Sequence, residues 1–261
     1  MSALLESLDP RGVATVTLNR PERHNAFDDA LIAALTDTFI RLGADPGVRA
    51  VVLASAGKSF SAGADLDWMR RMATYGAEEN EADARCLAAM LHALDRLPKP
   101  VVALVQGAAY GGGVGLVACC DIVLASERAS FCLSEVRLGL IPATISPYVV
   151  NAIGARQARR YMVTAEVIPA ARAREIGLVH EVVPPDGLAQ AGEAMLATLL
   201  ASAPQAQAEA KALAFLAEGR AVDAALGAET ARRIAQRRAS EEGREGVTAF
   251  LERREPAWRG R

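Results

Sequence analysis

The sequence predicts an α/β fold followed by a helical C-terminal third. Near the N-terminus a strand, helix and strand pattern fills about forty residues (13–54), which implies a right-handed crossover and parallel pairing of the two strands. After residue 147 the apolar spacing becomes almost wholly helical. With 261 residues and 51% hydrophobic content, the chain can also bury a sizeable core.

The elements expected before residue 101 follow from alternating or helically spaced apolar residues. Prolines and glycines mark their ends, as Pro98 does for the last helix of this part. In order they are a half-buried strand at 13–19, a polar loop at 20–25, a helix at 28–42, a strand at 50–54, a turn of small residues at 57–65, a helix from about 66 and a covering helix at 78–97.

A stretch without a single charge runs from Val101 to Cys120. Its length raises the possibility of a membrane span, but five glycines fall inside it. Each glycine inside a helix costs about 0.8–1 kcal/mol relative to alanine, so a single long helix is disfavoured. We predict instead a buried strand at 101–105, a glycine turn at 107–113 and a short buried helix through Cys120, with a further buried strand at 121–125.

The C-terminal part carries one strand pattern, at 177–183, among helices. No linker rich in proline, glycine or serine separates it from the α/β part, so we expect one continuous unit. The predicted helices are at 148–153, 155–164, 170–176, 188–201, 204–217, 221–239 and 246–254.

Charge and cysteine content narrow the class of protein. The formal net charge of −2 gives no electrostatic reason to expect a nucleic-acid or membrane partner. The four cysteines lack C-x-x-C spacing and the three histidines are scattered, so we expect reduced thiols and no metal site. The first residues resemble neither a signal peptide nor a transit peptide, which predicts a cytoplasmic protein.

The two turns of small residues, at 57–65 and 107–113, could take part in catalysis. Such turns leave the first N–H groups of the next helix unpaired, and these donors suit an oxygen that gains negative charge during a reaction. A close helix–sheet contact would explain the glycines equally well. A dinucleotide site is disfavoured because Gly113 to Ala118 fits that fingerprint only loosely and no acidic residue follows at the required distance.

Glu135 is the candidate acid/base group because it lies among apolar residues, which would raise its pKa toward a value useful for proton transfer. An ion pair with Arg137 is the alternative. Asp65 precedes the helix that begins near Leu66, and we prefer a helix-capping role for it over catalysis.

Three motifs together resemble one family. They are Phe60-Ser-Ala-Gly-Ala-Asp65, the run from Gly107 to Asp121, and Ser134-Glu135 followed by Leu138-Gly-Leu-Ile-Pro142. Their order and spacing are similar to those of the crotonase, or enoyl-CoA hydratase/isomerase, family. The resemblance implies a spiral core of ββα units at 1–190 and a helical trimerisation region at 191–261. It also implies an acyl-CoA substrate, no separate cofactor because coenzyme A is part of the substrate, and a homotrimer or dimer of trimers.

The resemblance also assigns residues to roles. The N–H groups of Ala64 and Gly112 would form an oxyanion hole for the thioester oxygen, and Glu135 would be the catalytic acid/base. Residues matching the family's adenine- and pantetheine-binding segment, or lying beside the reacting group, would bind substrate: Arg23, His24, Ala26, Ala62, Asp65, Gly111, Gly115 and Thr144.

The chain departs from the hydratase pattern at Gly115, where hydratases typically carry a first catalytic glutamate. The segments FSAGADLDWMRRM and FCLSEVRLGLIPATISPYVV are nonetheless most similar to bacterial methylglutaconyl-CoA and isohexenylglutaconyl-CoA hydratases. We therefore expect a hydratase of a branched, carboxylated enoyl-CoA, with Gly115 leaving room for the acyl chain and Thr144 or Ser146 holding a water. An enoyl-CoA isomerase using Glu135 alone, or a low-turnover acyl-CoA-binding homologue, are the alternatives.

Overall fold

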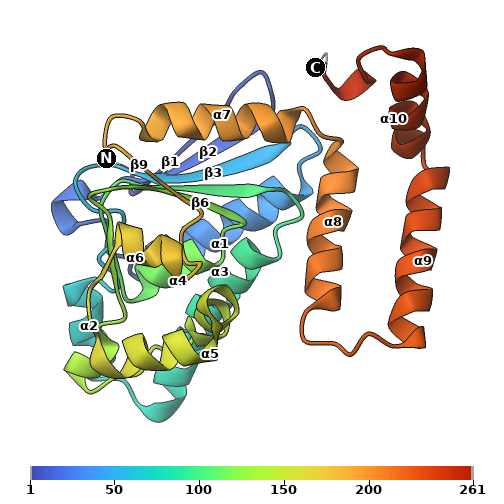
Figure 1. Cartoon of the computed structure of the whole chain (residues 1–261). Helices are drawn as coiled ribbons and strands as arrows, with labels where there is room; N and C mark the ends of the chain where they lie inside the picture. Colours follow the sequence, from blue (N-terminus) through green and yellow to red (C-terminus); the bar gives the residue numbers. More distant parts are fainter. Residues whose placement is uncertain (1, 260–261) are drawn as a thin grey trace.

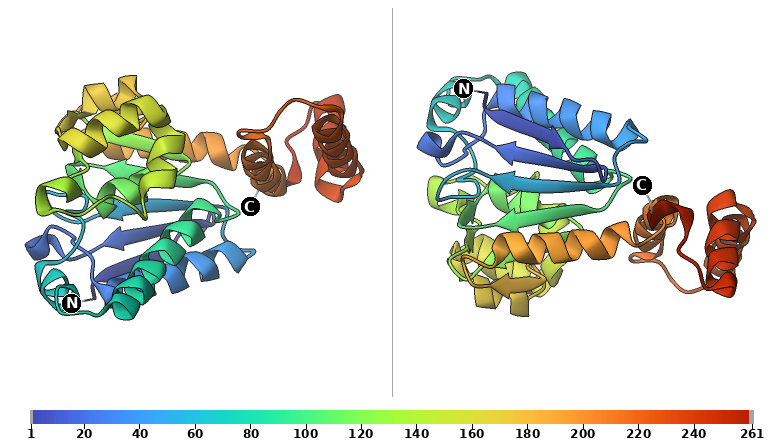
Figure 2. Two further views of the ribbon diagram at one scale, coloured as in Figure 1. Left: turned by 90° about the horizontal axis from the view of Figure 1, so that it is seen from below. Right: turned by 90° about the horizontal axis from the view of Figure 1, so that it is seen from above.

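The computed structural model describes residues 2–259, which form a sheet-centred body and a helical arm (Figure 1). The arm consists of α8 (Pro204–Ala217), α9 (Ala224–Ala239) and α10 (Glu241–Glu252). Figure 2 shows it projecting from the body beyond the end of α7 (Leu188–Leu200). The predicted α/β fold class with a helical C-terminal region is confirmed.

The body is built on a six-stranded sheet in the order β1-β2-β3-β4-β6-β9. All pairs are parallel except β1 with β2. The sequence did not indicate β1, because its side chains are mostly exposed and so lack a buried apolar face. The strands are β1 (Leu4–Leu8), β2 (Val13–Leu18), β3 (Ala50–Ser55), β4 (Val101–Val105), β6 (Ile122–Ser126) and β9 (Glu181–Val183).

A smaller sheet of β5 (Ala108–Tyr110), β7 (Ser130–Cys132) and β8 (Ile168–Pro169) lies after the ends of the central strands. The chain passes from β4 into β5 and from β6 into β7, so each unit puts one strand in each sheet. The predicted glycine turn at 107–113 therefore contains a short strand. Three residues, Ala-Ala-Tyr, are too few to show a period of two.

Helices cover both faces of the large sheet (Figure 1). On one face α1, α3 and α4 enclose the main core, together with the start of α5. On the other face α7 packs on β3, β4 and β6 through two smaller apolar clusters. The helices of the body are α1 (Asp29–Ala44), α2 (Leu66–Met72), α3 (Ala77–Asp95), α4 (Gly112–Ala118), α5 (Ser146–Thr164) and α6 (Ala170–Glu175).

The two helices predicted at 148–153 and 155–164 are the halves of α5. They meet at Gly154, whose φ of 74° and ψ of 151° break the helical conformation. A positive φ is readily adopted by glycine, which explains why the kink falls at this residue.

The uncharged stretch at 101–120 forms β4, β5 and α4, and most of its side chains are buried within the body. In the part of the chain that the structure describes, no helix is both long and apolar enough to span a bilayer. The expected division at residue 190 falls inside α7, which packs along its length on the sheet. A division after α7, where the arm begins, fits the structure better.

Candidate active site

The two turns of small residues meet in space, one before α2 and one before α4. The Tyr110 N–H donates to the Ser61 carbonyl at 2.9 Å, and Ser61 and Ala109 form a parallel bridge. A Cβ atom built on Gly63 would lie 2.8 Å from the Tyr110 carbonyl oxygen and 3.4 Å from the Gly112 nitrogen. Only glycine fits at residue 63, since φ there is also 85°.

Several backbone donors at this junction have no protein partner within residues 2–259. Among residues 2–259, the N–H groups of Ala64 and Gly112 donate to no protein oxygen, whereas the Gly111 N–H donates to the Cys132 carbonyl at 2.8 Å. Gly112 is the first residue of α4, so its N–H has no acceptor within the helix. A pair of unengaged N–H groups on neighbouring turns is the arrangement that stabilises a developing oxyanion.

Phe27 holds the two turns together, and the sequence did not single it out. Its N–H donates to the Gly63 carbonyl at 2.8 Å, and its own carbonyl accepts from Asp65 at 2.9 Å. Its ring covers Gly112, where an added Cβ would lie 2.4 Å from the ring. In the sequence, Phe27 stood out only as a single aromatic residue in a largely polar segment, which is the signal that could have indicated a buried contact.

Glu135 begins the short 3₁₀ helix η2 (Glu135–Leu138), beside the N-terminal end of α4. A Cβ built on Gly111 would lie 3.3 Å from Glu135 Oε1. Glu135 Oε2 is buried and accepts no hydrogen bond within residues 2–259. Burial raises the pKa of the carboxyl, opposed by a hydrogen bond from its own backbone N–H. A carboxyl with a raised pKa is better suited to proton transfer than an exposed one.

The alternative ion pair between Glu135 and Arg137 does not form. Arg137 instead donates through Nη2 to the carbonyl of Ala165, at 2.6 Å. The guanidinium therefore supports the C-terminal end of α5, and Glu135 is left without a counter-ion among the described residues.

The expectation that Gly115 leaves room for an acyl chain is wrong in this structure. A Cβ built on Gly115 would lie 2.3 Å from Ile145 Cγ2 and 2.9 Å from Ile145 Cβ. Ile145 is 1% exposed and belongs to the main core. The sequence could not reveal this, because Gly115 and Ile145 lie thirty residues apart in the chain.

The two hydroxyl groups proposed to hold a water differ in their surroundings. Ser146 Oγ donates to the Ala143 carbonyl at 2.8 Å, so it contributes to the turn that begins α5. The half-buried Thr144 hydroxyl makes no side-chain hydrogen bond within the described residues. Thr144 is thus the better placed of the two for a water, and its role stays a prediction.

The loop before α1 is fixed to the 57–65 turn by backbone contacts. The Ala62 N–H donates to the His24 carbonyl at 2.9 Å, and the Ala26 N–H donates to the Arg23 carbonyl at 3.1 Å. His24 Nδ1 lies 3.0 Å from Ser59 Oγ. Arg23, His24 and Ala62 are exposed, whereas Ala26 is buried. The structure thus brings these predicted binding residues together.

Asp65 acts through protein partners. Its carboxylate caps α2, accepting from the N–H groups of Asp67 and Trp68, and pairs with Arg23 at 2.9 Å and Arg20 at 3.2 Å. Burial alone would raise the pKa of Asp65, but these hydrogen bonds hold it below its ordinary value. Asp65 therefore positions Arg23 instead of facing a ligand itself, in line with the capping role preferred from sequence.

A cleft of about 740 Å³ lies against this loop and α2. Three arginines line it, and each of them also contacts a carboxylate. The lining also carries four carboxylates, so its charge is mixed, and only the arginine N–H groups are donors of the kind that bind phosphate. Its lining residues are Ala3, Asn19, Arg20, Pro21, Glu22, Arg23, Asp28, Asp65, Asp67 and Arg71.

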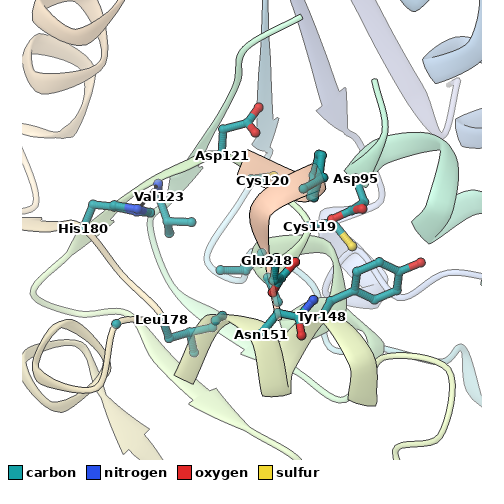
Figure 3. Close-up of a pocket in the computed structure, with 15 residues that line it drawn as sticks. Asp95, Cys119, Cys120, Asp121, Val123, Tyr148, Asn151, Leu178, His180 and Glu218 are labelled. Atoms are coloured by element: carbon teal, nitrogen blue, oxygen red, sulfur yellow. Dashed lines mark hydrogen bonds between the residues drawn. The ribbon is translucent and has the colours of Figure 1, made fainter. Parts of the chain in front are cut away.

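A second cavity of about 280 Å³ lies at the opposite, C-terminal end of α4 (Figure 3). It contains none of the predicted site residues. Lys211 of α8 pairs there with Asp121 at 2.8 Å, and Arg96 stacks on Phe215 of α8 at 3.8 Å. These contacts fasten the arm to the body. No group of residues within 2–259 has the make-up of a metal site.

The fold and the contact between the two turns of small residues define a class of protein. Comparison with known proteins identifies that class. The family model described as enoyl-CoA hydratase/isomerase matches residues 9–261. The crystal structure of an enoyl-CoA hydratase from Shewanella pealeana superposes with a TM-score of 0.95 at 46% identity, covering 98% of this chain and 96% of that one. The structure of Pseudomonas aeruginosa AtuE gives a TM-score of 0.94 at 38% identity, covering 99% of this chain and 100% of that one.

A curated relative, the 2,3-dehydroadipyl-CoA hydratase of Escherichia coli, is 32% identical over 262 residues and covers the full length of both chains. The chain therefore belongs to the enoyl-CoA hydratase/isomerase, or crotonase, family. It is an enzyme of the enoyl-CoA hydratase type.

Proposed function

We propose that the enzyme adds water to a branched 2-enoyl-CoA whose acyl group carries a carboxylate, such as 3-methylglutaconyl-CoA. One observation carries the reaction type. The unengaged N–H groups of Ala64 and Gly112 lie near the half-buried carboxyl of Glu135, whose buried Oε2 has no partner in the described chain. An oxyanion site and one acid/base group both serve the addition of water to an α,β-unsaturated thioester, which requires a positioned water as well.

In this mechanism the thioester oxygen accepts hydrogen bonds from Ala64 and Gly112. Water adds to the β-carbon, the C=C electron pair moves toward the thioester, and negative charge gathers on the oxygen that the two N–H groups hold. Glu135 gives its proton to the α-carbon and recovers a proton from the added water. The Glu135 carboxyl is thus restored in each turnover, and the product gains a hydroxyl group at the β-carbon and a hydrogen at the α-carbon, which together are the elements of one water.

Two similarities to other hydratases support the proposed acyl group. The segments around α2 and η2 resemble those of methylglutaconyl-CoA hydratases, and the name of the Escherichia coli relative denotes a dicarboxylic acyl group. The Thr144 hydroxyl would hold the attacking water. Since Ile145 fills the space beside Gly115, the acyl chain must leave the site in another direction.

The coenzyme A part of the substrate would bind along the loop before α1. Its phosphate groups would meet the arginines of the 740 Å³ cleft, Arg20, Arg23 and Arg71, which share the lining with four carboxylates. His24, Ala26 and Ala62 would contribute the neighbouring backbone. No separate cofactor is needed, because the thioester itself supplies the activated carbonyl.

A second candidate, double-bond isomerisation, is favoured by the single carboxylate. Moving a double bond from the 3- to the 2-position needs only one group to remove a proton and return it two carbons away. Glu135 alone meets that requirement, whereas hydration also needs a positioned water.

A panel of three thioesters separates these functions. The enzyme is incubated with 3-methylglutaconyl-CoA, crotonyl-CoA and a 3-enoyl-CoA in ¹⁸O-labelled water. The products are separated by liquid chromatography, which resolves double-bond isomers of equal mass, and are then analysed by mass spectrometry. We expect labelled oxygen in the product of 3-methylglutaconyl-CoA and slower labelling of crotonyl-CoA. Conversion of the 3-enoyl-CoA without label would establish the isomerase, and binding of all three without conversion would overturn both candidates.

A further inference from the structure

The peptide unit that joins Gly63 to Ala64 sets the direction of one proposed oxyanion donor. In a planar trans peptide the C=O group and the following N–H point in opposite directions. The Gly63 carbonyl accepts from the Phe27 N–H at 2.8 Å, so the Ala64 N–H points away from the Phe27 backbone. The next N–H, that of Asp65, donates to the Phe27 carbonyl at 2.9 Å. The orientation of the Ala64 donor therefore depends on where Phe27 lies.

Asn25, two residues before Phe27, is 0% exposed and is held by its side chain. Its Nδ2 donates to the Ala56 carbonyl at 2.7 Å and to the Ser59 carbonyl at 2.8 Å. Its Oδ1 accepts from the Arg20 N–H at 2.8 Å. Both N–H donors and the oxygen are thus engaged, as a buried amide requires. This one side chain joins the loop before α1 to the turn of small residues before α2.

The backbone of Asn25 is attached to the same turn. Its carbonyl accepts from Ser61 Oγ at 2.9 Å, and that hydroxyl oxygen accepts from the Gly63 N–H at 3.2 Å. Two hydrogen bonds in series therefore run from Asn25 to the residue before Ala64. The φ of Asn25 is 54°, in the left-handed region that asparagine tolerates better than most residues. Both the backbone and the side chain of this position therefore suit asparagine.

We propose that Asn25 is a positioning residue for the oxyanion pair: its buried amide holds Phe27 in place, and Phe27 directs the Ala64 N–H toward the thioester oxygen. The inference rests on the proposed oxyanion role of Ala64 and adds a residue that, being fully buried, does not touch the substrate. A donor stabilises the transition state only when it is aimed at the developing charge, so a small rotation of the peptide before Ala64 lowers the rate.

Two substitutions remove the amide in different ways. Asn25→Gly deletes the side chain but suits the left-handed φ, so the backbone contacts can persist. Asn25→Asp keeps the shape and an acceptor for the Arg20 N–H. Burial beside two carbonyl oxygens favours the protonated carboxyl, which can donate to only one of them. We therefore expect the aspartate variant to be the milder of the two, and it remains informative if the glycine variant does not fold.

Thr38→Val is the matched control. Thr38 is 4% exposed and donates through Oγ1 to Glu6 Oε1 at 2.9 Å, so this substitution also deletes a buried side-chain hydrogen bond. That bond joins α1 to β1 and involves neither of the two turns. Thermal unfolding shows which variants fold and compares their losses of stability.

The main readout is the infrared band of a ¹³C-labelled thioester carbonyl in bound butyryl-CoA, a saturated ligand that cannot be hydrated. Hydrogen bonds to the carbonyl oxygen lower the frequency of this band, so it reports on the donors without turnover. A merely structural role would reduce the amount of folded protein and leave the band of the bound ligand in place. The kcat is measured in parallel with whichever thioester of the panel is converted.

We expect wild type and Thr38→Val to share one lowered frequency. In Asn25→Gly the band should return part of the way toward that of free butyryl-CoA, and kcat should fall by about 10²-fold, with Asn25→Asp between the two. If the folded Asn25 variants kept the wild-type band, or if Thr38→Val moved it equally, the role of Asn25 would be overturned.

The same measurements separate this inference from the proposed function. A wild-type band at the frequency of free butyryl-CoA, or no binding of butyryl-CoA, would overturn the oxyanion pair and the role of Asn25 together. A band that moves only in the Asn25 variants, with no thioester of the panel converted, would support the role of Asn25 and overturn the proposed hydration.

Discussion

At the scale of single residues, the candidate site depends on backbone N–H groups and one carboxyl. Glu135 carries the acid/base chemistry in our proposal because its Oε2 is buried and has no partner in the described chain. Its neighbour Arg137 points elsewhere and contacts Ala165. A substitution of Glu135 therefore tests the role of the carboxyl, and a substitution of Arg137 on the same 3₁₀ turn is the control.

We predict that Glu135→Gln lowers kcat by a factor of about 10²–10⁴, the usual contribution of a positioned acid/base group. The amide keeps the shape of the side chain, so acyl-CoA binding, measured by calorimetry, should persist. Arg137→Gln should keep most of the wild-type turnover. A Glu135→Gln enzyme as active as the Arg137→Gln enzyme would contradict the assignment.

For the oxyanion pair we predict that Gly112→Pro loses about 10²–10³-fold in kcat, since proline removes one donor. Any side chain at residue 112 also presses on the Phe27 ring. Gly112→Ala is therefore the control, because it adds the same Cβ and keeps the N–H. The kcat of both folded variants is measured by steady-state kinetics. An equal loss of kcat in the two variants would show that crowding, and not the lost donor, is responsible.

At the scale of elements, Asp65 joins helix α2 to the loop before α1. It caps the helix and pairs with Arg20 and Arg23, so its charge supports two segments at once. The sequence predicted the cap, because an aspartate directly before a helical stretch is a common helix start. The arginine pairing depends on a loop forty residues earlier and required the tertiary structure.

The lowered pKa of Asp65 predicts a pH dependence of stability. The contacts of the folded protein stabilise the ionised Asp65 carboxylate, which the unfolded chain does not do. This contribution to the free energy of unfolding is present above the ordinary pKa of 3.8 and is lost as pH falls below it. We expect Asp65→Asn to be less stable than wild type near neutral pH and the difference to shrink between about pH 5 and pH 3. Urea unfolding across this range measures it.

Asp67→Asn is the matched control for that experiment, because Asp67 pairs with the same Arg23 but its side chain is 53% exposed. Exposed ion pairs contribute little to stability, so Asp67→Asn should remain close to wild type at every pH. If the gap between Asp65→Asn and wild type stayed constant down to pH 3, the carboxylate would not be the source of the difference.

At the scale of the whole molecule, the arm exposes several large apolar side chains on α9 and α10. On α10 the exposed fractions are 58% for Val247, 82% for Phe250 and 74% for Leu251, and on α9 Ile234 is 49% exposed. The arm also projects from the body (Figure 2), so its own chain does not cover these residues. We propose that other copies of the chain cover them in a homotrimer or a dimer of trimers.

This assembly predicts that Phe250→Glu combined with Leu251→Glu yields smaller particles than wild type in light scattering, because charges replace the buried apolar contact. Ile40→Glu is the control, since Ile40 is 61% exposed on α1 of the body. A wild-type protein that is monomeric at micromolar concentration would rule out the assembly.

The sequence by itself determined the fold class, most of the large sheet and the chemical parts of the site. Apolar alternation located β2, continuous apolar runs located β3, β4 and β6, and glycines at two strand-to-helix turns indicated unpaired N–H groups. Both signals are local, because strand period and glycine conformation act over a few residues. The isolated carboxylate in an apolar stretch was visible for the same reason.

Only the tertiary structure decided how these parts meet. The small sheet has strands of two or three residues, too short for a sequence pattern, yet β5 and β7 bring the turn at Gly111 to Glu135. Phe27 joins the two turns, and Ile145 fills the space that Gly115 leaves. These contacts link residues far apart in the chain, and close packing in the core, which no local pattern encodes, fixes them.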